Sequence, residues 1–258
     1  MLFLLSPAKT LDFETPLPEL PDSLPLWPER SARLVQALRG KSARQLGELM
    51  AISPALAELN QARFKDWRPE FTPLNSRQAV FAFDGDVYDG LQARGLRPAD
   101  LAWAQRHLRI LSGLHGLLRP MDRIQPYRLE MGTALPVGGD RNLYEYWRRP
   151  VADQLNAELA ADATPVVVNL ASQEYFRAVD PSRLRARVIE CVFEEWKDGH
   201  WKVISFFAKK ARGLMARHAI LERVRTPGGL ESFSLEGYRF AEQASAPGRL
   251  VFRRKMQG

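Results

Sequence analysis

The sequence predicts a mixed α/β (α+β) fold, in which a single domain has a partly antiparallel sheet flanked by helices. Short β-rich runs recur along the whole chain, and helical stretches separate them. Lys197-Asp198-Gly199-His200 lies between two such runs and is typical of a hairpin turn with Asp-Gly at its tip. The 258 residues, of which 45% are hydrophobic, are enough to bury one large core. We therefore treat residues 1–258 as one domain with a small helical insertion.

Strands are predicted, in chain order, at residues 2–5, 79–83, 166–170, 187–196, 200–207 and 249–254. The first run ends after four residues at Ser6-Pro7, so it is too short for the apolar part of a signal sequence or for a membrane span. It also lacks the preceding cationic residues of a signal sequence. We expect this run to be a buried strand. Residues 187–207, which contain the hairpin turn, are expected to pair in antiparallel fashion.

A single cysteine, Cys191, excludes an internal disulfide and fits a reducing compartment, of which the cytoplasm is the simplest example. Its apolar neighbours in the run 187–196 predict a buried thiol in a strand rather than a nucleophile. We therefore expect a cytoplasmic protein with no membrane partner.

Residues 29–67 are predicted to be wholly helical and to form a helix-hairpin-helix-like subregion. Two short helices meet within residues 49–57, where Ser53 suits an N-cap and Pro54 a first helical residue. Ala51 and Ser53 occupy positions that the helix-hairpin-helix DNA-binding motif usually gives to glycine, because backbone amides there must approach a phosphate closely. An ordinary corner between two helices would look similar. The candidate DNA contacts of this segment are Arg44, Ala51, Ile52, Ser53, Pro54, Arg63 and Lys65.

Residues 206–217 join the end of an apolar run to a helix start that is rich in cations. If residues 208–224 form one helix, rotation by about 100° per residue places Lys209, Arg212 and Arg223 on one side. The opposite, core-facing side would carry Ala211, Leu214, Met215 and Leu221. The cations face an anionic ligand in one interpretation and only solvent in the other. The whole chain has 37 Lys and Arg against 30 Asp and Glu, a formal charge of +7, which permits phosphate-bearing partners without requiring them.

Polar clusters follow apolar runs at several expected strand or helix ends, where α/β proteins commonly form binding clefts. These clusters are residues 6–10, 84–88, 126–130 and 169–175. A pocket that joined them would be strongly electropositive, with cations from Lys9, Arg128 and Lys209 or Lys210. The side chains available for orientation or proton transfer would be Tyr88, Tyr127, Glu130 and Glu174. Alternatively, the clusters are caps, turns and satisfied ion pairs.

Metal and cofactor sites are not expected. The sequence has no phosphate loop, no glycine-rich dinucleotide turn and no nucleophile elbow. Its four histidines are scattered without a ligand spacing, and one cysteine cannot build a thiolate site. Asp84 and Asp86 form one Asp-Gly-Asp turn, which is weak evidence for a hard cation. We predict no cofactor and no bound iron or zinc.

Motifs in a fixed order carry a family resemblance along essentially the full length. They are residues 6–12, 83–90 with Gly-Asp-Val-Tyr, 111–120, 126–132 with Pro-Tyr-Arg-Leu-Glu-Met-Gly, 169–175 and 208–215. In these motifs the chain resembles the YaaA family of bacterial peroxide-stress proteins. It departs from the family pattern at Asp84, where a basic residue is frequent, and at His115, where Tyr is usual. Asp84 would reduce the positive potential of its loop.

The resemblance implies a cytoplasmic protein of the hydrogen-peroxide response that is linked to limiting free iron and to protecting DNA. It also implies binding of double-stranded or branched DNA through a positive cleft and a helix-hairpin-helix, on a distinctive mixed α/β fold. Carried over to this sequence, the cleft would be lined by Lys9, Arg128, Lys209, Lys210 and Arg212.

Two hypotheses follow. In the first, the chain is a DNA-binding protein that recognises shape and phosphate. In the second, it is an enzyme for a small anionic or nucleotide substrate, with a pocket of Lys9, Tyr88, Arg128, Glu130, Glu174 and Lys209. Convergence of these side chains in one concave pocket would favour the enzyme, and cations spread over a face as wide as a double helix would favour DNA. Neutralisation of the cations by carboxylates would count against nucleic-acid binding.

Overall fold

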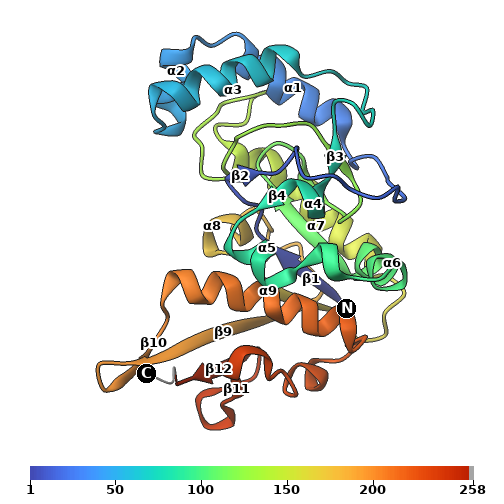
Figure 1. Cartoon of the computed structure of the whole chain (residues 1–258), viewed down its shortest axis with the longest axis vertical. Coiled ribbons are helices and arrows are strands. Elements are labelled where there is room, and N and C mark those ends of the chain that lie inside the picture. The colour runs from blue at the N-terminus through green and yellow to red at the C-terminus, as the bar shows by residue number, and fades with distance from the viewer. Residues whose placement is uncertain (256–258) are drawn as a thin grey trace.

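The centre of the molecule is a mixed sheet, which is eight-stranded within the described residues (Figure 1). The structure is a computed structural model that describes residues 1–255. The strand order is β11-β12-β9-β8-β1-β5-β6, and β10 pairs with β9 alone. The bounds of these strands are β1 Leu2–Leu5, β5 Leu108–Ser112, β6 Gly116–Leu118, β8 Val166–Leu170, β9 Arg187–Lys197, β10 His200–Lys202, β11 Arg239–Phe240 and β12 Arg249–Arg254.

Strand β1 lies between two parallel neighbours, and this position determines where a site can form. Leu5 is opposite Ile110 of β5 on one side and opposite Leu170 of β8 on the other. From β1 the chain builds β5 and β6 on one side of the sheet and later adds β8, β9 and β12 on the other. The direction in which the chain adds strands to the sheet therefore reverses between β1 and β8. Strands β6, β10 and β11 are antiparallel to their neighbours.

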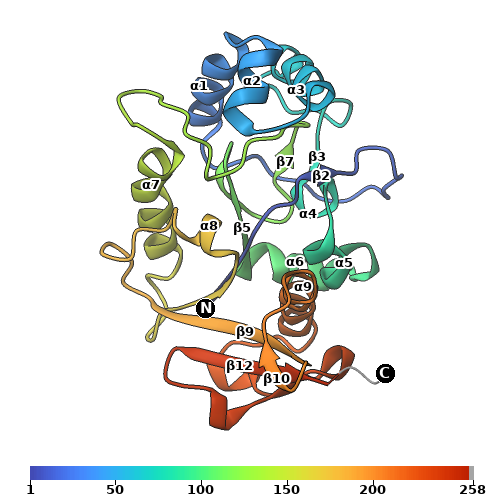
Figure 2. The ribbon, with the colours of Figure 1, turned by 90° about the vertical axis from the view of Figure 1, so that its left-hand side faces the viewer.

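Helices cover both faces of this sheet. Figure 2 shows α7 on one side of it and α5, α6 and α9 on the other, while α1, α2 and α3 lie together at one end of the molecule. The helix bounds are α1 Pro28–Arg39, α2 Ala43–Met50, α3 Pro54–Asp66, α4 Ala79–Ala82, α5 Asp86–Leu91, α6 Pro98–His107, α7 Leu143–Glu158, α8 Gln173–Phe176 and α9 Ser205–Leu221. Two small ladders pair β2 (Thr10–Leu11) with β4 (Phe83–Asp84) and β3 (Arg77–Gln78) with β7 (Arg123–Ile124). No helix of the described residues has both the length and the apolar character needed to cross a bilayer.

Helices α5 and α9 touch backbone to backbone through two glycines. A Cβ added at Gly213 would lie 1.8 Å from the carbonyl oxygen of Val87, and one added at Gly90 would lie 2.1 Å from that of Lys210. Only residues without a side chain permit this approach. The crossing sets Asp86, at the start of α5, opposite Lys209 of α9.

A buried ionic cluster joins β9, β12 and the loop before β11. Glu195 is 2% exposed, accepts a hydrogen bond from the Tyr238 hydroxyl and pairs with Arg254 across 3.0 Å. Arg254 lies directly opposite Glu195 in the parallel ladder, and its guanidinium is 4.5 Å from the Tyr238 ring centre. Buried carboxylates need such partners because desolvation of an unpaired charge is costly.

The mixed, partly antiparallel sheet with flanking helices is confirmed, and so are most of the predicted elements. Strands form at 2–5, 166–170, 187–197 and 249–254, and Asp198 and Gly199 form the hairpin tip with positive φ angles. The segment 29–67 contains α1, α2 and α3. Cys191 is buried in β9, as predicted.

One predicted strand is wrong, and another is too long. Residues 79–82 form the helix α4, and only Phe83 enters a strand. All four α4 residues are buried, and a short run that is apolar on every side does not distinguish a strand from a helix. The strand predicted at 200–207 ends at Lys202, because α9 already begins at Ser205. Phe206 is consequently an exposed residue of the first helical turn, with 56% of its surface accessible.

The predicted helix 208–224 is displaced towards the N-terminus. Ala211, Leu214 and Met215 are buried, as predicted, but Leu221 is 40% exposed. Arg223 lies beyond the helix with a φ of 53° and pairs with Asp100, so it does not extend the stripe formed by Lys209 and Arg212. The β propensity of Phe206 and Phe207 predicts a strand up to residue 207. The packing of α9 overrides this propensity, so the helix begins earlier, at Ser205.

Candidate functional site

A cavity of about 410 Å³ opens at the carboxyl ends of β1 and β8. The loop after β1, the loop after β8, the start of α5 and one face of α9 form its wall. The charged residues that line it are Lys9, Asp84, Asp86, Glu174, Lys209 and Arg212. Three of the four polar clusters predicted from the sequence thus meet here, together with the cationic helix.

Hydrogen bonds fix the loops around this cavity. The Ser172 amide donates to Ser6 Oγ across 2.9 Å, which ties the loop after β8 to the loop after β1. The Tyr88 hydroxyl donates to the Ser6 carbonyl oxygen across 3.1 Å, which ties α5 to the same loop. Burial raises the pKa of Tyr88 well above its ordinary value, so its hydroxyl remains protonated. The Tyr88 hydroxyl therefore helps to fix the position of the loop after β1.

The fourth cluster, residues 126–130, borders the cavity through ion pairs. Glu130 accepts from Lys9 Nζ at 2.8 Å and from Arg128 at 3.0 Å, so one carboxylate holds two cations. Glu174 accepts from the Gly132 amide at 3.0 Å. Tyr127 lies outside the cavity, where its hydroxyl is 2.7 Å from Ser112 Oγ, and burial raises its pKa.

Most cations of the predicted cleft have carboxylate partners. Besides Lys9 and Arg128, Lys209 lies 3.8 Å from Asp86, and Lys210 lies 2.6 Å from Glu236. The exposed Glu236 also approaches Arg254, at the edge of the buried ionic cluster, and Lys210 does not line the cavity. This pairing reduces the free positive charge that the DNA hypothesis requires.

Arg212 is the exception among the cleft cations. It is half-buried on α9, lines the cavity, and has no hydrogen-bond or ion-pair partner among residues 1–255. Burial lowers the pKa of Arg212, and the negative charge of Glu190 only partly offsets this lowering. The Asp84 carboxylate, which also lines the cavity, is exposed and has no partner in the described part of the chain. The cavity therefore presents one unpaired cation and one unpaired anion.

The predicted hairpin lies at the far end of the molecule. Ser53 Oγ accepts from the Leu56 amide and caps α3, and Pro54 is the first residue of that helix. Ala51 has φ 50° and ψ 51°, the left-handed conformation that glycine adopts most easily. Ala51, Ser53 and Pro54 are exposed, and Ile52 is half-buried. The two helices and the turn are present, and their use as a DNA-binding motif stays a prediction.

The cations near this hairpin are less constrained than those of the cavity. Arg44 is 89% exposed and pairs with Glu48 one helical turn away, at 2.9 Å. Lys65 is exposed, and Arg63 is half-buried with a pKa lowered by burial. Neither Arg63 nor Lys65 has a side-chain partner among the residues described. Arg63 and Asp84 line a second hollow, of about 630 Å³, which connects α3 with the edge of the first cavity.

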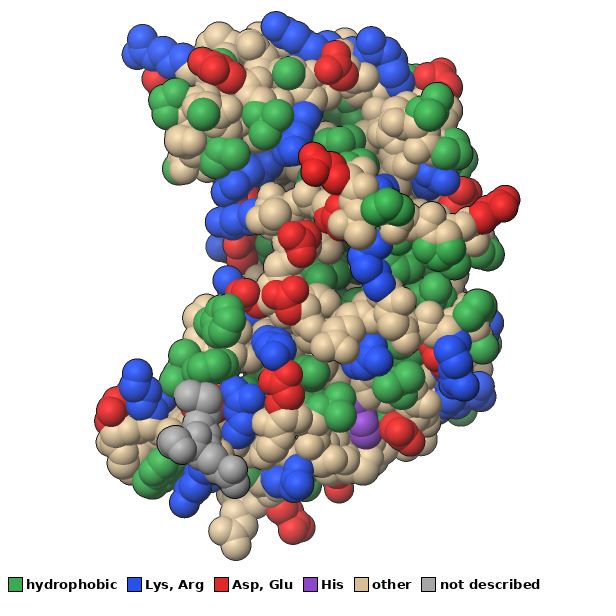
Figure 3. Space-filling view, viewed as in Figure 1, with side chains coloured by type: hydrophobic (Ala, Val, Ile, Leu, Met, Phe, Trp, Pro, Cys, Tyr) green, Lys and Arg blue, Asp and Glu red, His purple; other side chains and the backbone are tan. Residues whose placement is uncertain are grey.

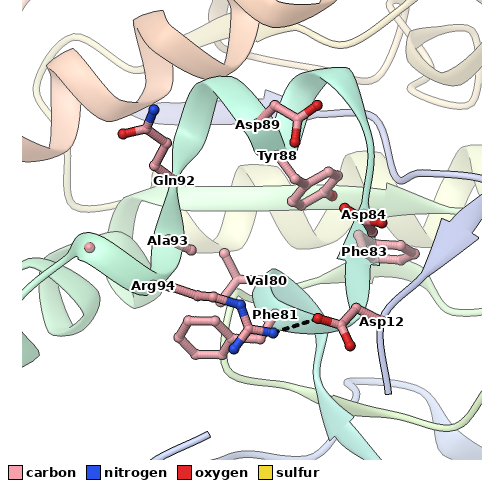
Figure 4. A pocket seen from close by; sticks show the side chains of 11 residues that line it. Asp12, Val80, Phe81, Phe83, Asp84, Tyr88, Asp89, Gln92, Ala93 and Arg94 are labelled. Carbon is pink, nitrogen blue, oxygen red and sulfur yellow. Dashed lines mark hydrogen bonds and ion pairs between the residues drawn. The ribbon is translucent and has the colours of Figure 1, made fainter. Parts of the chain in front are cut away.

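Asp84 also borders a third pocket, of about 340 Å³, between α5 and the loop after β2 (Figure 4). Asp12 and Arg94 pair across this pocket at 2.7 Å. Burial opposes ionisation of Asp12, but backbone hydrogen bonds from Thr15 and Glu14 and the charge of Arg94 lower its pKa to about 2. This ion pair fixes the loop after β2. The sequence does not predict the Asp12–Arg94 ion pair, although Asp12 is the last residue of the first family motif.

Figure 3 shows a concave edge at the left, between the α1–α3 end and the β9–β10 end of the molecule. Lys and Arg side chains gather along this edge, with Asp and Glu side chains among them. Within residues 1–255 there is no group of three or more His, Cys, Asp and Glu side chains that could hold a metal ion.

Comparisons with known proteins identify the family. A family described as "Peroxide stress protein YaaA" matches residues 1–244. A UPF0246 protein of Paracidovorax citrulli is 62% identical over 259 residues and covers 100% of both chains. UPF0246 proteins of Bordetella petrii and Bordetella pertussis are 58% and 56% identical, and each match covers 99% of this chain and at least 99% of the relative. The chain therefore belongs to the family of the peroxide stress protein YaaA.

Proposed function

We propose that this chain binds double-stranded or branched DNA along its concave edge, as a cytoplasmic protein that limits iron-driven oxidative damage. The observation that carries the proposal is the half-buried guanidinium of Arg63, which has no partner among residues 1–255 and lies on the same helix as the exposed Lys65, next to the helical hairpin. Half-buried cations without partners favour an anion as their missing ligand. A DNA phosphate can supply this anion to Arg63.

The helical hairpin supports the same proposal from the other end of the edge. At the start of the 13-residue helix α3, Pro54 has no N–H and Ser53 Oγ caps the Leu56 amide, so the Ala55 amide is the one that can meet a phosphate oxygen at this helix terminus. Exposed small residues at Ala51 and Ser53 let a phosphate come close. The exposed Arg44–Glu48 pair has little stability of its own, so Arg44 can exchange Glu48 for a phosphate.

The carboxylate pairs set the expected salt dependence. Lys9, Arg128 and Lys210 are paired with carboxylates, so the phosphate contacts of DNA come chiefly from Arg44, Arg63 and Lys65 at the hairpin end of the edge. About three phosphate contacts correspond to a slope of roughly −3 in a plot of log affinity against log salt concentration. Binding should therefore be moderately and not steeply sensitive to salt.

The double variant Arg63→Ala, Lys65→Ala should weaken DNA binding and reduce that slope by about 2, because each lost phosphate contact removes roughly one unit. Fluorescence anisotropy with a labelled four-way junction and a plain duplex, at several salt concentrations, measures both quantities. The matched control is Arg106→Ala, Arg225→Ala, which removes two exposed cations near α6, away from the concave edge. Equal losses in the two double variants would mean that only net charge matters, and the concave edge would not be the DNA site.

A further inference from the structure

The cavity at the end of β1 has the position of a small-ligand site in α/β proteins. In sheets of this type, ligands bind outside the carboxyl ends of the strands, at the point where the strand order reverses. Here that point lies between β1 and β8, and the loops after both strands line the cavity. Its volume of about 410 Å³ falls in the usual range for pockets that hold a small organic molecule.

The charges of this cavity do not suit a DNA strand. Lys9, Lys209 and Arg212 are balanced by Asp84, Asp86 and Glu174 in the same wall. A phosphodiester backbone that entered would bring successive negative charges against these carboxylates, which is unfavourable. A ligand with one acidic group and several hydrogen-bond donors would find partners for both, since the acidic group could meet the cations and the donors could meet the carboxylates. This composition favours a small, mixed-polarity molecule.

The unpaired groups indicate how such a ligand is oriented. Arg212 offers a planar fork of donors with no acceptor among the described residues, and this geometry matches phosphate oxygens in a bidentate manner. Lys209 is 3.8 Å from Asp86, too far for a strong hydrogen bond, so it can turn towards the same phosphate. The free Asp84 carboxylate accepts from hydroxyl or amino groups at the other end.

We propose that the cavity binds a phosphate monoester of mononucleotide size. Arg212 and Lys209 bind the phosphate, and Asp84 and Glu174 accept hydrogen bonds from the hydroxyl or amino groups of the ligand. The fixed loops around Ser6 make the site largely preformed, since the hydrogen bonds from Ser172 and Tyr88 hold them without a ligand. This site is separate from the hairpin and from Arg63. It goes beyond DNA binding and gives the chain a small-molecule ligand.

Isothermal titration calorimetry of the full chain with the four ribonucleoside 5′-monophosphates tests the proposal, with the parent nucleosides and inorganic phosphate as comparison probes. At least one monophosphate should bind with one-to-one stoichiometry, and at least tenfold more tightly than its nucleoside or inorganic phosphate. Arg212→Met should weaken that binding at least tenfold. The control Arg106→Met removes an equal charge outside the cavity and should leave the affinity for the monophosphate unchanged.

Two further variants keep the result interpretable. Lys209→Met changes a half-exposed side chain, so it should fold normally and still weaken monophosphate binding. Asp84→Asn should reduce the preference for the monophosphate over inorganic phosphate, because it alters only the donor-binding end. The proposal is overturned if no monophosphate binds, if inorganic phosphate binds as tightly, or if Arg106→Met and Arg212→Met have equal effects. The Arg63→Ala, Lys65→Ala variant should retain monophosphate binding, which separates this site from the proposed DNA site.

Discussion

Gly213→Ala is expected to lower the free energy of unfolding by about 3 kcal/mol or more, which is the upper range for overpacking a close contact. The new methyl group would lie 1.8 Å from the Val87 carbonyl oxygen, and a backbone atom cannot move aside as a flexible side chain can. Alanine in a helix interior gains only about 1 kcal/mol over glycine. The steric cost therefore exceeds the gain in helix propensity.

Gly47→Ala is the matched control, because Gly47 also lies inside a helix, α2, but its added Cβ would have only ordinary contacts at 3.5 Å. This variant should raise the free energy of unfolding by about 0.5–1 kcal/mol. Urea denaturation followed by circular dichroism measures both changes. The α5–α9 crossing would not need its glycine if Gly213→Ala were as stable as the wild type.

Arg254→Met should lower the free energy of unfolding by about 3–5 kcal/mol, because it leaves a buried carboxylate without its cation. Glu195 is 2% exposed and cannot turn to solvent to replace Arg254. Burial and the Glu195 hydrogen bond raise the pKa of Tyr238, so its hydroxyl stays a donor, but one neutral donor does not balance the charge. Thermal and chemical denaturation both report the loss.

The double variant Glu195→Gln, Arg254→Met separates charge from packing. If the loss comes from the uncompensated carboxylate, removal of that charge should recover most of the stability, since replacing both members of a buried pair is often nearly neutral. A double variant as unstable as Arg254→Met alone would instead assign the loss to the packing of Arg254 on Tyr238 and Phe207.

The sequence predicts strands best where turn residues bound a β-rich run, as at residues 187–197 and their Asp-Gly hairpin. It does not reveal β5, because Leu108 follows α6 directly, without a turn signal between helix and strand. The run 79–82 is fully buried, so its apolar character reflects its surroundings rather than a pleated strand. Strand order depends on long-range packing that no local pattern encodes.

For the candidate site, local patterns predicted the gathering of polar loops but not the pairing of their charges. The loops converge because the carboxyl ends of parallel strands meet at one edge of the sheet. Which carboxylate holds which cation depends on distant segments, as with Lys9 and Glu130 or Lys210 and Glu236. Counting cations in the sequence therefore overstates the positive field that a partner meets.

The central placement of β1 also makes this protein a promising scaffold for redesign. Its crevice is built from connecting segments after β1 and β8, whereas the hydrogen-bond ladder of these strands ends at Leu5 and Leu170. Segments beyond the ladder tolerate changes in length better than the strands themselves. An engineer could therefore enlarge the pocket at residues 7–9 and alter which molecules enter it, while the parallel sheet underneath retains its register.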